Sequence, residues 1–394
     1  MKFRAGIILA LFLFSVPAMA TNFTVEGEMS SKILCEINRN IAVEPGVQSV
    51  TLSYIIPGSF KSSTVKQDIK GFNLTFSPEP TVKTTKTDKR GAWMIVATWQ
   101  NPPESIDVSM NFEASNLTEL KKITTDAVYP VEKIPSDALD YLKPTKLIQS
   151  DDPRILRIAR ELTEDASTEF DAVQHIISWV VDHVRYVTPP QAYDALYSLE
   201  SGMGNCQNYS HLSAALMRAA GIPVRIINGI TLKKPYDVNN RKGVLTLRMG
   251  QGRHSWNEVW FPDLGWVPFD PSQTALFVSN RYLRIEAGSD NDETINDGRL
   301  RWTQTQGKKG KIRSREGINA DFSGDKIKIK GIPERYGPRN LLMCPPITAE
   351  FRRVELEEAM AEVFPPIVMT SGEPLESTPE QPPVEVATAP PEPP

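Results

Sequence analysis

The spacing of apolar residues changes near residue 150, and this change constrains the fold more than any other feature of the chain. Up to about residue 130, β-branched and aromatic residues alternate with polar ones in short runs bounded by Gly, Pro or Asn. The runs are SVTLSYIIPG (49–58), GFNLTFSP (71–78), AWMIVATWQ (92–100) and SIDVSMNFEA (105–114). A period of two is typical of strands, and short strands at this spacing favour a β-sandwich.

From Asp151 onward the apolar residues follow a helical period. Asp152 is placed to cap a helix whose first residue is Pro153, and a second helix follows over about 167–187. A third helix begins at Cys206, where one side is expected to be buried through the apolar residues Leu212, Ala215, Leu216 and Ala219. Gly221 and Pro223 then end it, and a buried strand follows over 223–230. Helices followed by strands predict an α+β fold.

The first twenty residues have the features of a secretory signal peptide. Lys2 and Arg4 precede the apolar run 5–16, and Ala18 and Ala20 form a small-x-small cleavage pattern. The run is too short to span a bilayer comfortably, and no other segment is long and apolar enough. We therefore expect a secreted or periplasmic protein that begins near Thr21 and has no membrane span after cleavage.

The rest of the chain divides by composition. Residues 365–394 contain ten prolines and five glutamates but no Lys or Arg, which is typical of a disordered tail. The expected organisation is a signal peptide (1–20), a β-rich N-terminal domain (21–135), an α+β core (150–275), a β-rich extension (276–350), a short helix (351–364) and the tail. The net charge of −4 is dispersed, so no nucleic-acid partner is expected.

The three cysteines are an odd number for an oxidising compartment, so at least one has no intramolecular partner. A bridge between Cys35 and Cys344 would leave Cys206 available for chemistry. The sequence alone does not establish that pairing.

A predicted hairpin carries the second informative cluster. In RHSWNEVWFPDLGWVPFDPS (253–272), His254, Trp256 and Glu258 alternate along one strand, and Trp266 and Asp270 alternate along the next. If the hairpin is centred on Pro262, His254 lies opposite Asp270 and Glu258 lies opposite Trp266. The first pair would be close enough to hydrogen-bond.

This arrangement suits a thiol nucleophile. An ordinary thiol has a pKa of about 8.5 and reacts slowly at neutral pH unless its thiolate is stabilised. At the start of a helix, Cys206 would feel the positive end of the helix dipole, and a protonated His254 would add a full charge. Asp270 would hold the second ring nitrogen of His254. The chain order Cys, His, Asp resembles that of papain-like hydrolases, whose third member is Asn.

The segments GNCQNYSHLSAALMRAAGIPVRIING and HSWNEVWFPDLGWVPFDPS resemble the core of the transglutaminase-like superfamily, in a bacterial secreted form. That family has a G-x-C helix ending in G-[IV]-P-[AV]-R, followed by H-x-W-x-E and G-W-x-x-x-D-P. The resemblance covers roughly residues 150–275. It implies a papain-like α+β core with Cys206 as nucleophile, His254 as general base and acid, and Asp270 as the orienting group.

Several side chains near this cluster have other interpretations. A zinc site from Cys206, His211 and His254 lacks a fourth ligand at normal spacing, so no metal and no cofactor is expected. His211 is interpreted as a packing or hydrogen-bonding residue, and His175 and His183 as surface or satisfied core histidines. Trp256, Glu258 and Trp266 are interpreted as the scaffold of the hairpin. The second oxyanion donor, beside the Cys206 N–H, is open between Tyr186, Gln191 and Tyr193.

These residues predict acyl transfer through a Cys thioester on a protein or peptide substrate, with partners in the cell envelope. Water as the acceptor would make the protein a protease or amidase, which we favour, whereas a lysine-like amine would make it a crosslinking transglutaminase. A noncatalytic binding or assembly module on the same fold is the second alternative. A purely structural β-rich adhesion protein would not explain residues 200–272.

Overall fold

The structure is a computed structural model that describes residues 25–240, 243–273, 276–306, 310–330 and 347–352. The predicted signal peptide, Cys344 and the proline-rich segment 365–394 lie outside the described residues. So does the helix expected over 351–364, apart from residues 351 and 352, which end a strand instead. No helix in the described ranges is long and apolar enough to cross a membrane.

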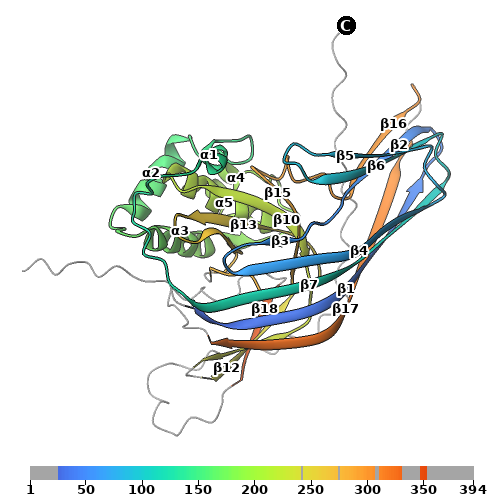
Figure 1. The fold of residues 1–394 in the computed structure, drawn as a ribbon. Helices are drawn as coiled ribbons and strands as arrows, with labels where there is room; N and C mark the ends of the chain where they lie inside the picture. Colours follow the sequence, from blue (N-terminus) through green and yellow to red (C-terminus); the bar gives the residue numbers. More distant parts are fainter. Residues whose placement is uncertain (1–24, 241–242, 274–275, 307–309, 331–346, 353–394) are drawn as a thin grey trace, which may run out of the picture.

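An eight-stranded, mainly antiparallel sheet is the largest element of the described part of the chain. Its strands, in spatial order, are β18 (Ile347–Arg352), β12 (Gly243–Met249), β11 (Tyr236–Asn240), β17 (Ile312–Lys330), β1 (Val25–Val43), β7 (Ser105–Ile123), β4 (Val65–Ser77) and β3 (Phe60–Lys61). Figure 1 shows β1, β7 and β17, of 19 residues each, curving side by side along one side of the molecule. These long strands therefore connect the two ends of the protein.

A second antiparallel sheet covers one end of the first. Its strands, in order, are β16 (Arg299–Gln304), β2 (Val47–Ile55), β6 (Trp93–Gln100) and β5 (Val82–Thr87). Buried side chains of both sheets fill the space between them, including Ile37, Leu52, Tyr54, Trp99 and Phe112. The β-sandwich expected from the alternating runs is confirmed, because β2, β4, β6 and β7 form where those runs occur.

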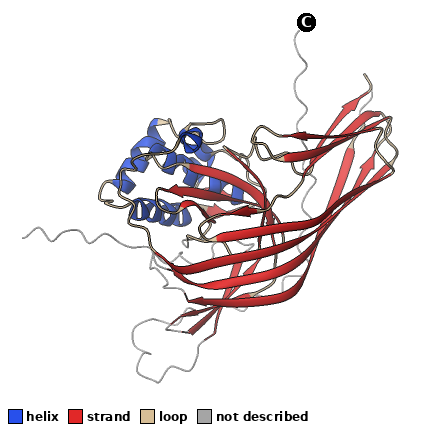
Figure 2. Ribbon diagram, in the orientation of Figure 1, coloured by secondary structure: helices blue, strands red, loops and turns tan. Residues whose placement is uncertain are grey.

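The helices gather at the other end of the molecule (Figure 2). They are α1 (Ser136–Leu139), the 3-10 turn η1 (Asp140–Leu142), α2 (Pro153–Thr163), α3 (Glu169–His183), α4 (Ala195–Ser201) and α5 (Cys206–Ala219). The predicted cap of α2 is present, because the Asp152 side chain accepts a hydrogen bond from the Arg154 N–H. The expectation that α5 buries only one side is wrong: every residue from Asn208 to Arg218 is buried, so α5 is a central helix.

A third sheet lies between α5 and the eight-stranded sheet. Its antiparallel strands, in order, are β14 (Gly265–Phe269), β13 (Gly252–Phe261), β10 (Val224–Thr231) and β15 (Tyr282–Gly288). Ile226 and Val259 on one face pack with α5, whereas Ile227 and Trp256 on the other join a cluster with Met29 of β1. The eight-stranded sheet, through β1, is thus packed directly against the face of the third sheet that is turned away from α5.

Strands from the C-terminal part join the three larger sheets; the fourth sheet of the described residues pairs only β8 (Arg185–Tyr186) with β9 (Met203–Gly204). β15 extends the third sheet, β16 pairs with β2, and β17 pairs with β1 from Glu26↔Lys330 to Val43↔Ile312. The β-rich segment expected over 276–350 therefore contributes to three different sheets: β15 and β16 join one each, and β17 and the start of β18 join the eight-stranded sheet.

The β13–β14 hairpin forms where the sequence predicts it, but the predicted register is wrong by two residues. Trp260, rather than Glu258, pairs with Trp266, and Glu258 pairs with Pro268. The turn between Phe261 and Gly265 is centred one residue later than Pro262, and Gly265 takes the positive φ of 70° that it requires. Because the shift is even, the side chains keep their faces.

Candidate active site

Cys206 is the first residue of α5, as predicted, and a network of two asparagines holds the start of this helix. The Asn205 side chain accepts from the Gln207 N–H at 3.0 Å, and the Asn208 side chain accepts from the Asn205 N–H at 3.1 Å. This reciprocal capping fixes the first turn. The partly exposed Cys206 therefore lies at the positive end of the α5 dipole.

His254 and Asp270 are hydrogen-bonded although they do not face each other in the ladder. The His254 Nε2 lies 2.6 Å from Asp270 Oδ2, and both side chains are buried. β14 ends at Phe269, opposite Asn257, so Asp270 follows the last pair and reaches diagonally back to His254. The expected contact thus forms through a different register.

The same early end of β14 leaves room for the sulfur. Beyond Asn257, the edge of β13 that carries His254 has no β14 partner. The Cys206 side chain lies beside His254 there and interacts with its ring. Since Nε2 is bonded to Asp270, Nδ1 is the ring nitrogen that remains for the sulfur. The structure therefore brings Cys206, His254 and Asp270 together, with His254 between the sulfur and the carboxylate.

The electrostatics of this arrangement favour a protonated imidazole. Burial by itself lowers the pKa of His254, but the Asp270 carboxylate and the Cys206 sulfur raise it to about 10. Burial by itself raises the pKa of Asp270. His254 and the two donors of Ser272 lower it by more than burial raises it, so the net shift is downward. An imidazolium held at neutral pH beside a sulfur is the charge that stabilises a thiolate.

Two residues that hold Asp270 were not predicted. The Ser272 N–H and Oγ donate to Asp270 Oδ1 at 3.0 and 2.6 Å, and the Tyr282 hydroxyl donates to Oδ2 at 2.8 Å. The Asp-Pro-Ser sequence could have indicated the first contact, because Asp side chains commonly bond to the N–H two residues later. Nothing in the sequence near Tyr282 indicates the second.

The three candidate oxyanion donors have different surroundings. Tyr193 interacts electrostatically with Cys206, since its pKa is raised first by burial and then by that sulfur. The Tyr186 ring stacks on Tyr209 at 6.3 Å, and the backbone of Gln191 donates to the Tyr197 hydroxyl. The structure therefore favours the phenol of Tyr193 among the three.

The scaffold residues of the hairpin lie as interpreted. Glu258 is fully buried, and its two oxygens pair with Arg225 and with Arg284, the latter at 3.0 Å. Arg225 also lies over the Trp266 ring, 4.3 Å from its centroid. These contacts fasten β13 to β10, β14 and β15, and none of them involves Cys206.

The remaining histidines bond to the backbone. His211 Nδ1 lies 2.6 Å from the Tyr193 carbonyl oxygen, His183 Nε2 lies 2.8 Å from that of Leu199, and His175 Nδ1 lies 3.1 Å from that of Leu162. No group of three His, Cys, Asp or Glu side chains that could hold a metal occurs in the described ranges.

Cys35 is buried in the sandwich, in the middle of β1. Its partners in the ladder are Phe112 and Ala320, and burial raises the pKa of its thiol to about 12. Because Cys344 lies outside the described residues, a Cys35–Cys344 bridge stays a prediction. Cys35 is not placed for chemistry at neutral pH.

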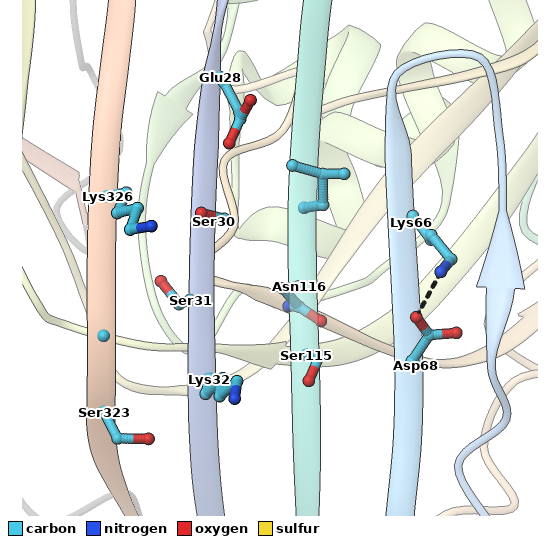
Figure 3. A pocket seen from close by; sticks show the side chains of 12 residues that line it. Glu28, Ser30, Ser31, Lys32, Lys66, Asp68, Ser115, Asn116, Ser323 and Lys326 are labelled. Atoms are coloured by element: carbon cyan, nitrogen blue, oxygen red, sulfur yellow. Dashed lines mark ion pairs between the residues drawn. The ribbon is translucent and has the colours of Figure 1, made fainter.

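A hollow of about 660 Å³ lies on the face of the eight-stranded sheet, across β17, β1, β7 and β4 (Figure 3). Its walls carry both charges, such as Lys32, Lys326 and the Lys66–Asp68 ion pair at 2.6 Å. None of Cys206, His254 and Asp270 lines it. The hollow is therefore not part of the site formed by Cys206, His254 and Asp270.

The comparison with known families decides what this core is. The profile of the transglutaminase-like superfamily matches residues 156–271. Residues 156–271 are a transglutaminase-like core. The matched span includes all of Cys206, His254 and Asp270 but leaves out Tyr282.

The chain matches only part of the length of each of the following curated relatives. The uncharacterized protein YebA of Bacillus subtilis is 28% identical over 177 residues, which is 42% of this chain and 23% of that protein. A protein-glutamine gamma-glutamyltransferase of Pseudomonas aeruginosa is 33% identical over 79 residues, or 20% of this chain and 11% of that one. An uncharacterized Haemophilus influenzae protein is 27% identical over 210 residues, 48% of this chain and 56% of its own.

Among solved structures, a Cytophaga hutchinsonii protein provisionally described as a cysteine protease has a similar fold. The TM-score is 0.53 at 16% identity, and the match covers 84% of this chain and 100% of that one. The likeness therefore includes β elements outside the transglutaminase-like core. At this identity it shows the fold alone.

Proposed function

We propose that the protein is a thiol acyl-transfer enzyme that cleaves peptide or carboxamide bonds. The observation that supports this most is the arrangement at the start of α5, where Cys206 lies beside His254 and His254 is hydrogen-bonded to Asp270 at 2.6 Å. This arrangement supports thioester chemistry, because it puts a sulfur beside a group that can carry positive charge and a buried carboxylate beside that group.

In the first half-reaction, the Cys206 thiolate attacks the carbonyl carbon of the substrate. The backbone N–H at the start of α5 and the Tyr193 phenol are the donors for the oxyanion that forms. The His254 imidazolium gives its proton to the leaving nitrogen, the C–N bond breaks, and an amine departs. The products of this step are a Cys206 thioester and a neutral imidazole.

In the second half-reaction, neutral His254 takes a proton from the acceptor, whose oxygen or nitrogen attacks the thioester. The C–S bond breaks, and the sulfur leaves as a thiolate beside the restored imidazolium. Asp270 keeps Nε2 protonated throughout, so that Nδ1 carries the proton transfer.

The acceptor decides between two activities. Cys206 and Tyr193 are both partly exposed, so water reaches the thioester, and this favours hydrolysis. The similarity to a γ-glutamyltransferase over 79 residues favours an amine acceptor instead. We propose hydrolysis as the main reaction on protein or peptide substrates, outside the cytoplasm and in the cell envelope, in line with the predicted signal peptide.

The experiment offers both acceptors at once. The purified protein is incubated with casein and a fluorescent primary amine, and both casein fragments and amine incorporation are measured, with Cys206→Ala as the control. Fragments that depend on Cys206 support a peptidase, and amine incorporation without cleavage would establish crosslinking instead. If neither product exceeds the Cys206→Ala background, the noncatalytic module becomes the better account.

A further inference from the structure

Asp270 is saturated with hydrogen bonds, and one of its donors comes from outside the transglutaminase-like core. Ser272 occupies Oδ1 with two bonds, whereas His254 and Tyr282 share Oδ2, at 2.6 and 2.8 Å. Two donors on one oxygen compete for the same charge. The Tyr282 hydroxyl therefore affects both where the carboxylate points and how strongly it attracts the imidazolium.

The ring of Tyr282 is fixed by aromatic packing. It meets the Trp256 ring edge-on, with centroids 5.2 Å apart and planes at 78°, and the His254 ring at 5.9 Å and 61°. Trp256 in turn stacks on His254 at 6.2 Å. Because Tyr282 is almost fully buried, its hydroxyl has little freedom to leave Asp270.

Strand β7 of the eight-stranded sheet anchors the backbone around Tyr282. Asn116 of β7 is buried, and its Nδ2 donates to the carbonyl oxygens of Tyr282 at 2.9 Å and of Asn280 at 3.3 Å. Thr118 on the same strand donates to the carbonyl oxygen of Val278 at 3.1 Å. The segment leading into β15 is thus attached by three side-chain bonds to a strand far from the core in sequence.

We propose that Tyr282 is a positioning residue of the active site, and that the eight-stranded sheet holds it in place through Asn116. The proposal rests on the proposed function, since it assigns Tyr282 a role toward Asp270 and His254. It also gives the N-terminal β domain a task, because the site is incomplete without the strand that β7 anchors.

The expected consequence is a shift in the proton affinity of His254. The phenol O–H points its positive end at the oxygen that also binds the imidazolium, so removing it strengthens the pull of Asp270 on the proton. Tyr282→Phe keeps the ring but lacks the hydroxyl. We expect the pH at which His254 loses its proton to rise by about half a pH unit or more.

Other titratable or charged groups near the site are few and identifiable. Cys206 on α5 faces His254, Tyr193 lies near Cys206, and Tyr236 on β11 and then Arg281 approach from the side of Asp270. Burial raises the pKa of Tyr236 to about 12, so it stays neutral through the range tested. Asp325 holds Arg281 by two hydrogen bonds of 2.7 Å.

The test is the rate of Cys206 alkylation by iodoacetamide from pH 4 to 11, followed by mass spectrometry of the peptide containing Cys206. The upper inflection of this profile reports deprotonation of His254. Tyr129→Phe is the matched control, because it removes a phenol bonded to Thr163 and Ala220 in the helical part. We expect the upper inflection to rise in Tyr282→Phe and to stay in place in Tyr129→Phe.

Three outcomes are distinguishable. An upper inflection that is identical in wild type and Tyr282→Phe, with Cys206 still reactive at low pH, overturns the positioning role but leaves the proposed function intact. A wild type without low-pH reactivity overturns the proposed function itself. Should Tyr282→Phe not fold, Asn116→Ala retains the phenol and loosens its anchor, and an unmoved inflection there also counts against the proposal.

Discussion

Gly229 on β10 lies directly opposite His254 on β13, and the absent side chain makes room for Trp256. A Cβ at residue 229 would lie 2.1 Å from the Leu283 carbonyl oxygen and 2.5 Å from Cη2 of the Trp256 ring. Neither distance is tolerable, and the carbonyl belongs to the backbone of β15. The indole that stacks on His254 therefore depends on this glycine.

Gly229→Ala is expected to destabilise the protein and to disturb the site together. Overpacking of a buried position typically costs about 1–3 kcal/mol. Urea unfolding should show a loss in this range, and alkylation of Cys206 at neutral pH should slow. Gly252→Ala, on the neighbouring strand β13 and with open space around its Cβ, is the control, and equal behaviour of the two variants would contradict the packing argument.

Replacing Asp270 with Asn tests the charge that holds His254. The amide retains an acceptor of the same shape but no longer stabilises an imidazolium, so the pKa of His254 should fall well below about 10. The upper inflection of the alkylation profile should move down, opposite to the shift expected for Tyr282→Phe. Asp263→Asn alters the turn at the far end of the hairpin and should leave the profile unchanged. A profile of Asp270→Asn that coincides with wild type would exclude the carboxylate from the site.

Glu258 is expected to be essential for stability rather than for chemistry. Removing one member of a buried ion pair leaves an uncompensated charge and typically costs about 3–5 kcal/mol. Glu258→Gln leaves Arg225 and Arg284 without a counterion, so urea unfolding should show a loss approaching that range. The exposed Glu161–Arg157 pair is the comparison, and Glu161→Gln should change stability by less than about 1 kcal/mol. Similar losses in both variants would refute the assignment.

Glu169 gives the protein a pH-dependent stability. Its carboxyl oxygens are buried without a hydrogen-bond partner, and burial, then the nearby Asp263 carboxylate, raise its pKa from 4.5 to about 9. Between these values the unfolded chain releases a proton that the folded protein keeps, so stability should fall as pH rises from 4.5 to 9.

Glu169→Gln removes the titrating carboxyl, so residue 169 no longer makes the free energy of unfolding depend on pH. The stability of this variant relative to wild type should improve as pH rises across that interval, as measured by urea unfolding at pH 5, 7 and 9. The control Glu164→Gln changes an exposed carboxylate nearby and should show no such trend. A difference between Glu169→Gln and wild type that is constant with pH would show that the carboxyl ionises normally.

The sequence predicted the parts of the site that depend on local patterns. The Asp152 cap, the start of α5 at Cys206 and the shared face of His254 and Trp256 all follow from residues close together in the chain. The strand β1 also has a local signal, because Met29, Ile33, Cys35, Ile37 and Ile41 are buried at odd positions, and the even positions between them are exposed or partly exposed and, apart from Leu34, polar.

Other features depend on contacts between distant segments. The hairpin register depended on where the turn is centred, and a two-residue shift preserves every face, so the pattern could not reveal it. The contact from Tyr282 to Asp270 depends on β15 joining the far side of β10, and its anchor depends on Asn116 in a different sheet. The spacing of residues along the chain does not predict these contacts between distant segments.

The most direct test of the account is the pH dependence of Cys206 alkylation in wild type and in His254→Ala. If the imidazolium stabilises the thiolate, wild-type Cys206 reacts with iodoacetamide well below pH 8, and His254→Ala loses that reactivity while remaining folded. If the two proteins give the same profile, the sulfur is not activated by His254, and the proposed acyl-transfer mechanism is contradicted.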